Sequence, residues 1–88
     1  MTAEEFSRQL RLAGFGEIVV VEREPNGRLG EHSHPFESQA LILAGEISLR
    51  VAGQERRYQV GEVFHLDNGQ RHEEWYGPAG VRYLVGRK

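Results

Sequence analysis

The chain has 88 residues, of which 39% are hydrophobic and 27% are charged, and this length predicts one domain, residues 1–88, with a single small core. It has no cysteine, which excludes disulfides and thiolate metal sites, and a formal charge of -2 with scattered basic residues, which argues against nucleic-acid partners. We find neither a signal peptide nor an apolar membrane span, so we expect a cytoplasmic protein that does not contact membranes.

The first predicted element is a short helix within residues 1–15. Thr2 followed by Glu5 is a capping box, in which each side chain bonds the other residue's backbone N–H. Phe6 and Leu10 then follow at helical spacing, before a glycine that favours a helix end.

The next predicted element is a strand whose two faces are both apolar. Residues 18–21 are all β-branched, so one face can pack into the core while the other needs a cover. The opening helix or a second copy of the chain would supply that cover, and we therefore predict a homodimer.

The rest of the chain, up to residue 87, alternates short apolar segments with turns that are rich in glycine, asparagine and aspartate. We expect breaks at residues 52–54, 67–69 and 77–80. Crossover helices, which a parallel sheet needs, are absent from this pattern. The pattern indicates an antiparallel sandwich or barrel, with strands at residues 17–21, 40–44, 47–51, 57–60, 61–66, 71–76 and 81–85. The predicted fold is a small antiparallel β-barrel over 17–87.

Three histidines form the strongest chemical signal. His32 and His34 are two positions apart, which in a strand turns both imidazoles to one face, close enough to share one metal ion. His72 follows a tight turn and lies far enough along the chain for two hairpin strands to separate it from this pair. A barrel would allow the three rings to meet.

Two segments resemble the sequence motifs of the cupin superfamily. GRLGEHSHPFESQALILAGEI is similar to the first motif and GEVFHLDNGQRHEEWY to the second, with Asp67 at the usual proline and Tyr76 where asparagine is frequent. The resemblance covers about residues 17–85. It implies a conserved jelly-roll barrel that encloses a metal ion, with His32, His34 and His72 as ligands.

The fourth ligand is the main departure from the family pattern. Ser38 stands at the position of the family's glutamate ligand. Gln39 is the preferred substitute through its amide oxygen, and Glu37 is the alternative. Without a carboxylate the ion's charge would be uncompensated, which favours an anionic ligand. Iron, manganese, nickel, zinc and copper all suit such a site.

Other polar side chains near these motifs have a functional and a structural interpretation. Glu74 shares the face of His72, which suggests a catalytic base or a hydrogen-bond partner inside the barrel, although that face could equally be the outer one. Arg82 and Arg87 would suit an anionic ligand or simply solvent. His65 is expected at the surface.

We predict a metal-binding cupin that binds a small polar or anionic metabolite, as a dioxygenase or an isomerase or epimerase. A non-catalytic ligand-sensing or accessory barrel that acts as a dimer is the alternative. In a third interpretation the chain has no metal and the barrel serves dimer formation alone.

Overall fold

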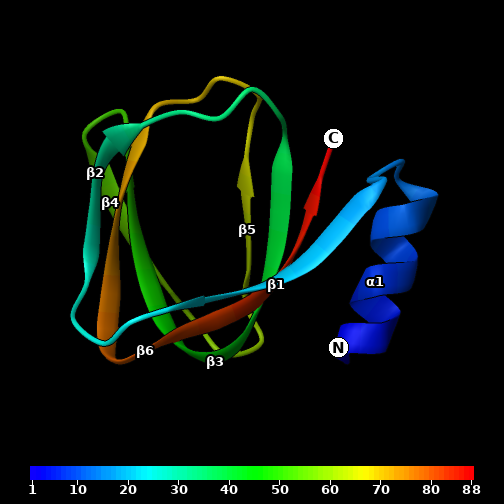
Figure 1. The fold of residues 1–88 in the computed structure, drawn as a ribbon, viewed down its shortest axis with the longest axis horizontal. Helices are drawn as coiled ribbons and strands as arrows, with labels where there is room; N and C mark the ends of the chain where they lie inside the picture. Colours follow the sequence, from blue (N-terminus) through cyan, green and yellow to red (C-terminus); the bar gives the residue numbers. More distant parts are fainter.

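Helix α1 (Ala3–Leu12) opens the computed structural model, which describes residues 1–88. The Glu5 amide donates to Thr2 Oγ1 at 3.1 Å and the Thr2 amide to Glu5 Oε1 at 3.4 Å, so the predicted capping box and helix are confirmed. The helix stands beside the strands (Figure 1). It is neither long nor apolar enough to span a membrane.

The strands pair only in antiparallel fashion, and two of them are much longer than the rest. The sheet order is β1–β6–β3–β4, with β2 added to β6 and β5 added to β3. Their bounds are β1 (Glu17–Arg23), β2 (Arg28–His32), β3 (Ser38–Val51), β4 (Gln54–Gln59), β5 (Val63–Leu66) and β6 (His72–Arg87).

The long strands β3 and β6 belong to both faces of the fold. The start of β3 and the end of β6 pair with each other and with β5 and β1, whereas their other halves pair with β4 and β2. In Figure 1 the strands accordingly form a ring. This confirms the predicted all-β antiparallel jelly roll. The sheet is not closed by hydrogen bonds, because β1, β2, β4 and β5 each pair with a single strand.

The predicted break at residues 77–80 is wrong, because β6 continues through it. Tyr76 of β6 pairs with Ile47 of β3. The next pair is Val81 with Gly45, so residues 77–80 form a bulge opposite a single residue of β3. A bulge of this kind needs glycine in an irregular backbone conformation, and so does a turn. For this reason the Gly-Pro-Ala-Gly sequence of the segment resembled a turn. Likewise β3 runs through Gly45, where we expected two separate strands.

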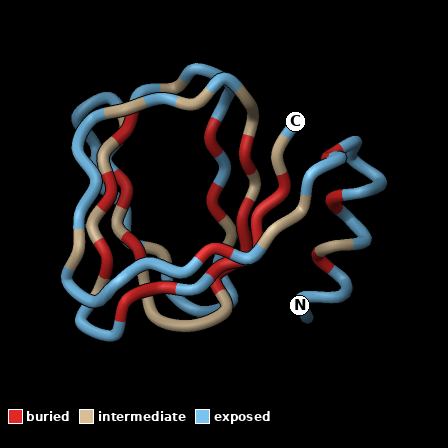
Figure 2. Tube along the Cα trace, viewed as in Figure 1, coloured by how far each residue is buried: buried red, intermediate tan, exposed pale blue.

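Alternation along the strands divides the apolar residues between two clusters. The larger cluster fills the ring, as the red inward segments of Figure 2 indicate, and includes Val21, Ile42, Phe64 and Tyr83. The smaller cluster lies on the outer face, where α1 packs against the sheet through Phe6, Leu10, Phe15, Leu41 and Leu84.

The outer face of β1 is only partly covered. Ile18 packs against the cluster beneath the helix, whereas Val20, on the same face, is 55% exposed. The helix thus supplies part of the cover that we predicted for this strand. The homodimer stays a prediction.

Candidate metal centre

Two of the three histidines lie on the neighbouring strands β2 and β6, and the third lies in the loop that leads from β2 to β3. His32 ends β2 and is the register partner of His72, which begins β6. His34 lies just beyond β2, and its carbonyl accepts a hydrogen bond from the Gly69 amide at 2.8 Å. This bond ties the His-x-His loop to the turn that precedes His72. Both motifs therefore end at the same rim of the ring.

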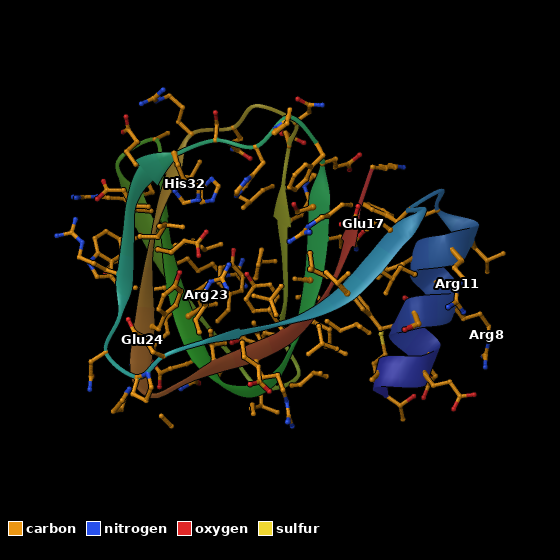
Figure 3. The ribbon with its side chains drawn as sticks, in the orientation of Figure 1. Arg8, Arg11, Glu17, Arg23, Glu24 and His32 are labelled. Atoms are coloured by element: carbon orange, nitrogen blue, oxygen red, sulfur yellow. The ribbon has the colours of Figure 1, made fainter.

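The structure brings the three imidazoles together. The ring centroids are 4.2 Å apart for His32 and His72, 4.9 Å for His32 and His34, and 5.4 Å for His34 and His72. His34 also stacks on Phe36, with 5.0 Å between ring centroids. Figure 3 shows His32 at the upper rim with its ring inside the strands.

Glu74 joins this group. Its Oε2 atom lies 3.1 Å from His72 Nε2 and 3.3 Å from His32 Nε2, and its other oxygen accepts a hydrogen bond from the Tyr76 hydroxyl at 3.0 Å. One ligand atom from each of His32, His34, His72 and Glu74 lies within 4.8 Å of every other. We expected Glu74 as a base or hydrogen-bond partner, and its position now makes it the candidate fourth ligand.

Backbone carbonyls orient two of the rings. His32 Nδ1 is 2.6 Å from the Gly30 carbonyl and His72 Nδ1 is 3.0 Å from the Gln70 carbonyl. A carbonyl only accepts hydrogen bonds, so Nδ1 must donate in both cases, and Nε2 faces the cluster. His32 Nε2 is buried and has no hydrogen-bond partner. Buried polar atoms are normally paired, and a cation bound here would satisfy this one. The donor set therefore fits a divalent transition-metal ion.

Protonation in the metal-free protein follows from these contacts. Burial lowers the pKa of His72, but its hydrogen bonds to Glu74 and to a backbone carbonyl outweigh burial and raise that pKa above 6.5. Burial raises the pKa of Glu74, and the hydrogen bonds from His72 and Tyr76 outweigh it, so this pKa is lowered. Burial and the charges of His32 and His72 lower the pKa of His34. Both shifts favour a protonated His72 beside an ionised Glu74, and a proton on His72 Nε2 must leave before a metal binds there.

Comparison with known proteins agrees with this geometry. The family model described as Cupin domain matches residues 19–85. The chain belongs to the cupin family. It is 34% identical over 61 residues to the tetracenomycin polyketide synthase protein TcmJ of Streptomyces glaucescens, a match that spans 68% of this chain and 41% of TcmJ. The cupin thus spans less than half the length of this relative.

Solved structures share the fold at low identity. A Rhizobium leguminosarum protein of unknown function has a TM-score of 0.75 at 16% identity, covering 80% of this cupin and 66% of that chain. A cupin-2 domain protein of Shewanella frigidimarina gives 0.66 at 17%, covering 77% and 65%. The Drosophila melanogaster CENP-C cupin domain gives 0.70 at 14%, covering 83% and 57%.

The two side chains that we considered for the fourth ligand lie elsewhere. On β3, Ser38 is buried and lines the interior, so the next residue, Gln39, shares the outward parity of Leu41, which packs under the helix. Glu37 pairs with His65 on the outside, at 2.6 Å between Oε2 and Nε2. The structure therefore does not bring Gln39 or Glu37 to the histidines.

The carboxylate of Glu74 also corrects an argument about charge. With Gln39 as the fourth ligand we expected no carboxylate at the ion, and hence an uncompensated divalent charge that favours an anionic substrate or a hydroxide. Glu74 offsets part of that charge from within the protein. Uncompensated charge on three neutral ligands is therefore no longer a reason to expect an anionic ligand.

A cavity of about 60 Å³ lies inside the ring, beside this cluster. His34, Phe36 and Glu74 line it at the cluster, and most of the rest of its wall is apolar. Arg23 and Arg87 line it as well. Arg23 was not among the residues predicted to face the interior. Only its spacing from Val19 and Val21 indicated that it shares their face, and the sequence does not show which face of this strand is inside.

Proposed function

We propose that this cupin binds one divalent transition-metal ion through His32, His34, His72 and Glu74, and that a small polar or anionic metabolite occupies the adjacent cavity. The observation that carries the proposal is the unpaired, buried Nε2 of His32, which faces three further ligand atoms within 4.8 Å. Imidazole and carboxylate together suit iron, manganese, nickel, zinc and copper. When bound, such an ion would supply a Lewis acid for an oxygen donor.

The surroundings of the cluster bear on which reaction the protein performs. An isomerase or epimerase needs a base that is free to take a proton from the substrate. Both Glu74 oxygens contact the histidines or Tyr76, and Glu37 pairs with His65 outside the cavity. The cavity wall holds no other carboxylate. These contacts disfavour proton-transfer chemistry and leave an oxygen-dependent dioxygenase as the catalytic candidate, for which turnover would stop without dioxygen.

The lack of a free base also supports the second candidate, a ligand-sensing or accessory cupin without turnover. TcmJ is by its name a polyketide synthase protein, and an accessory role beside a biosynthetic enzyme suits that likeness. The exposed Val20 on the outer face of β1 is where we expect a second copy to pack. Sedimentation of the purified protein tests the dimer, and a monomer at all concentrations would contradict it.

Elemental analysis of protein purified without an affinity tag or chelator tests the metal site, with His72→Ala processed identically. We expect about one metal ion per wild-type chain and little in the variant, because the imidazole of His72 is a ligand in this proposal. His65→Ala is the matched control, because His65 also contacts a carboxylate but lies outside the ring. Equal metal content in wild type and His72→Ala would contradict the proposal, as would no metal in any form after incubation with the candidate ions.

A further inference from the structure

Arg23 is a charged residue on the inward face of β1. Along this strand Val19 and Val21 contact the interior cluster, and Arg23 has the same parity. Figure 3 shows Arg23 within the ring of strands. The residue is exposed to solvent and also lines the cavity.

The guanidinium of Arg23 has no carboxylate partner, unlike those of its neighbours. Arg87, at the other end of the same cavity, pairs with Glu17 at 2.9 Å. Arg82 pairs with Glu22 at 3.9 Å on the outer face. Arg23 Nη1 donates to the Glu22 carbonyl at 3.3 Å, and the guanidinium also interacts with the Tyr76 hydroxyl. Most of its donors therefore remain available in the cavity.

A short row of side chains connects Arg23 with the metal cluster. The Tyr76 hydroxyl donates a hydrogen bond to Glu74, and Tyr83 lines the cavity together with Arg23. Burial and the charge of Glu74 raise the pKa of Tyr83 to about 12, and the nearby charge of Arg23 partly opposes them. The same opposition acts on Tyr76. The geometry agrees with this, because Tyr83 is the register partner of Val21, two residues before Arg23, and Arg23, Tyr83 and Glu74 line one cavity.

We propose that Arg23 binds a carboxylate of the molecule in the cavity, while other oxygen atoms of that molecule face the metal cluster. This rests on the proposed function. The planar fork of a guanidinium matches a carboxylate in two parallel hydrogen bonds. The cavity measures only about 60 Å³, which favours a small occupant. The ligand class is therefore a short carboxylic acid with a second oxygen-bearing group, such as a dicarboxylate.

L-Malate and L-lactate test this, because both carry a 2-hydroxy carboxylate and only malate has a second carboxylate. Binding is measured by titration calorimetry on metal-loaded wild type, Arg23→Gln and Arg82→Gln. Arg82 is the matched control, since it pairs across the same end of β1 and β6 but faces outward. We expect malate to bind wild type and Arg82→Gln about tenfold or more tightly than lactate, and Arg23→Gln to lose that difference.

Three results would overturn the assignment. These are equal malate affinity in wild type and Arg23→Gln, no malate binding to wild type at millimolar concentration, and equally tight binding of inorganic phosphate. Titration of the metal-free protein separates this proposal from the previous one. Malate binding that depends on Arg23 without metal would support the role of Arg23, whereas the metal site stands or falls by elemental analysis.

Discussion

Glu74 is the residue on which the chemistry of the interior depends. It accepts the hydroxyl of Tyr76 on one oxygen and faces His72 and His32 with the other. In the metal-free protein the hydrogen bonds outweigh the cost of burial for both groups, so they lower the pKa of Glu74 and raise the pKa of His72. The same carboxylate is therefore a counter-ion before metal binding and a candidate ligand after it.

A pH dependence of stability follows for the metal-free protein. Since the pKa of His72 is raised on folding, the folded chain binds more protons than the unfolded chain above pH 6.5. The free energy of unfolding should therefore fall as pH rises from 6.5 through the higher folded pKa. His34 does not contribute here, because its lowered pKa acts below 6.5. Glu74→Gln should abolish the fall, since burial then lowers the pKa of His72.

Urea unfolding of chelator-treated protein over this pH range measures the effect. Glu73→Gln is the matched control, because Glu73 is adjacent in sequence but on the other face of β6, where it pairs with Arg28 at 3.6 Å. The control should keep the wild-type pH profile. If Glu74→Gln loses stability with rising pH as steeply as wild type does, the source is not the His72–Glu74 pair.

The sequence predicted which candidate ligands share one face of a strand, but not whether that face is inside the ring. Spacing showed that Glu74 shares the face of His72, but whether this face is inside depends on how β6 pairs with β3 over long distances. The same pairing determines that Gln39 is turned outward, and the pairing of β1 with β6 determines that Arg23 is turned inward. A one-residue change in register would exchange these outcomes, and no local pattern in one sequence determines it.

Among the elements, the bulge in β6 matters most for the shape of the interior. Gly80 has φ +73°, and a Cβ there would collide with the Arg23 carbonyl at the end of β1. Gly45 of β3 has φ +71° and would collide with the Gly80 carbonyl in the same way. Three strands thus approach each other where only glycine fits. This contact bends β6 from one face of the ring to the other.

Gly80→Ala should destabilise the protein by about 2 to 4 kcal/mol, from the left-handed conformation and the collision together. Gly53→Ala isolates the first contribution, because Gly53 has φ +78° in the turn between β3 and β4 but no atom within 4 Å of an added Cβ. It should cost about 1 kcal/mol. Chemical denaturation measures both variants. An equal loss of stability in the two variants would mean that the close contact between β1 and β6 adds nothing to the cost of Gly80→Ala.

Helix α1 and the short strands β1, β4 and β5 were predictable because their signals are local, namely a capping box, β-branched runs and glycine turns, whereas β2 was not among the predicted strands. The continuity of β3 and β6 was not. Glycine at positive φ serves a turn and a bulge equally, and only the partner strand shows which one forms. The resemblance to cupins supplied the jelly roll, since alternation alone does not distinguish a barrel from a sandwich.

As a whole, the molecule has limited means of holding its ring together. The sheet is not closed by hydrogen bonds, and a chain of this length buries a small core. The candidate ligands come from two segments that are neighbours in the sheet, since His32 ends β2, His34 follows it, and His72 and Glu74 belong to β6. A metal ion there would join segments that are distant in sequence.

Metal removal should therefore lower the melting temperature of the whole domain. An ion that binds only the folded state at a free concentration of 100 times Kd adds about 2.7 kcal/mol, which for this size corresponds to roughly 10 to 20 °C. Scanning calorimetry of zinc-loaded and chelator-treated protein measures the shift. His65→Ala should keep it and His72→Ala should lose it. A shift of the same size in His72→Ala would mean that the ion stabilises the fold from another site.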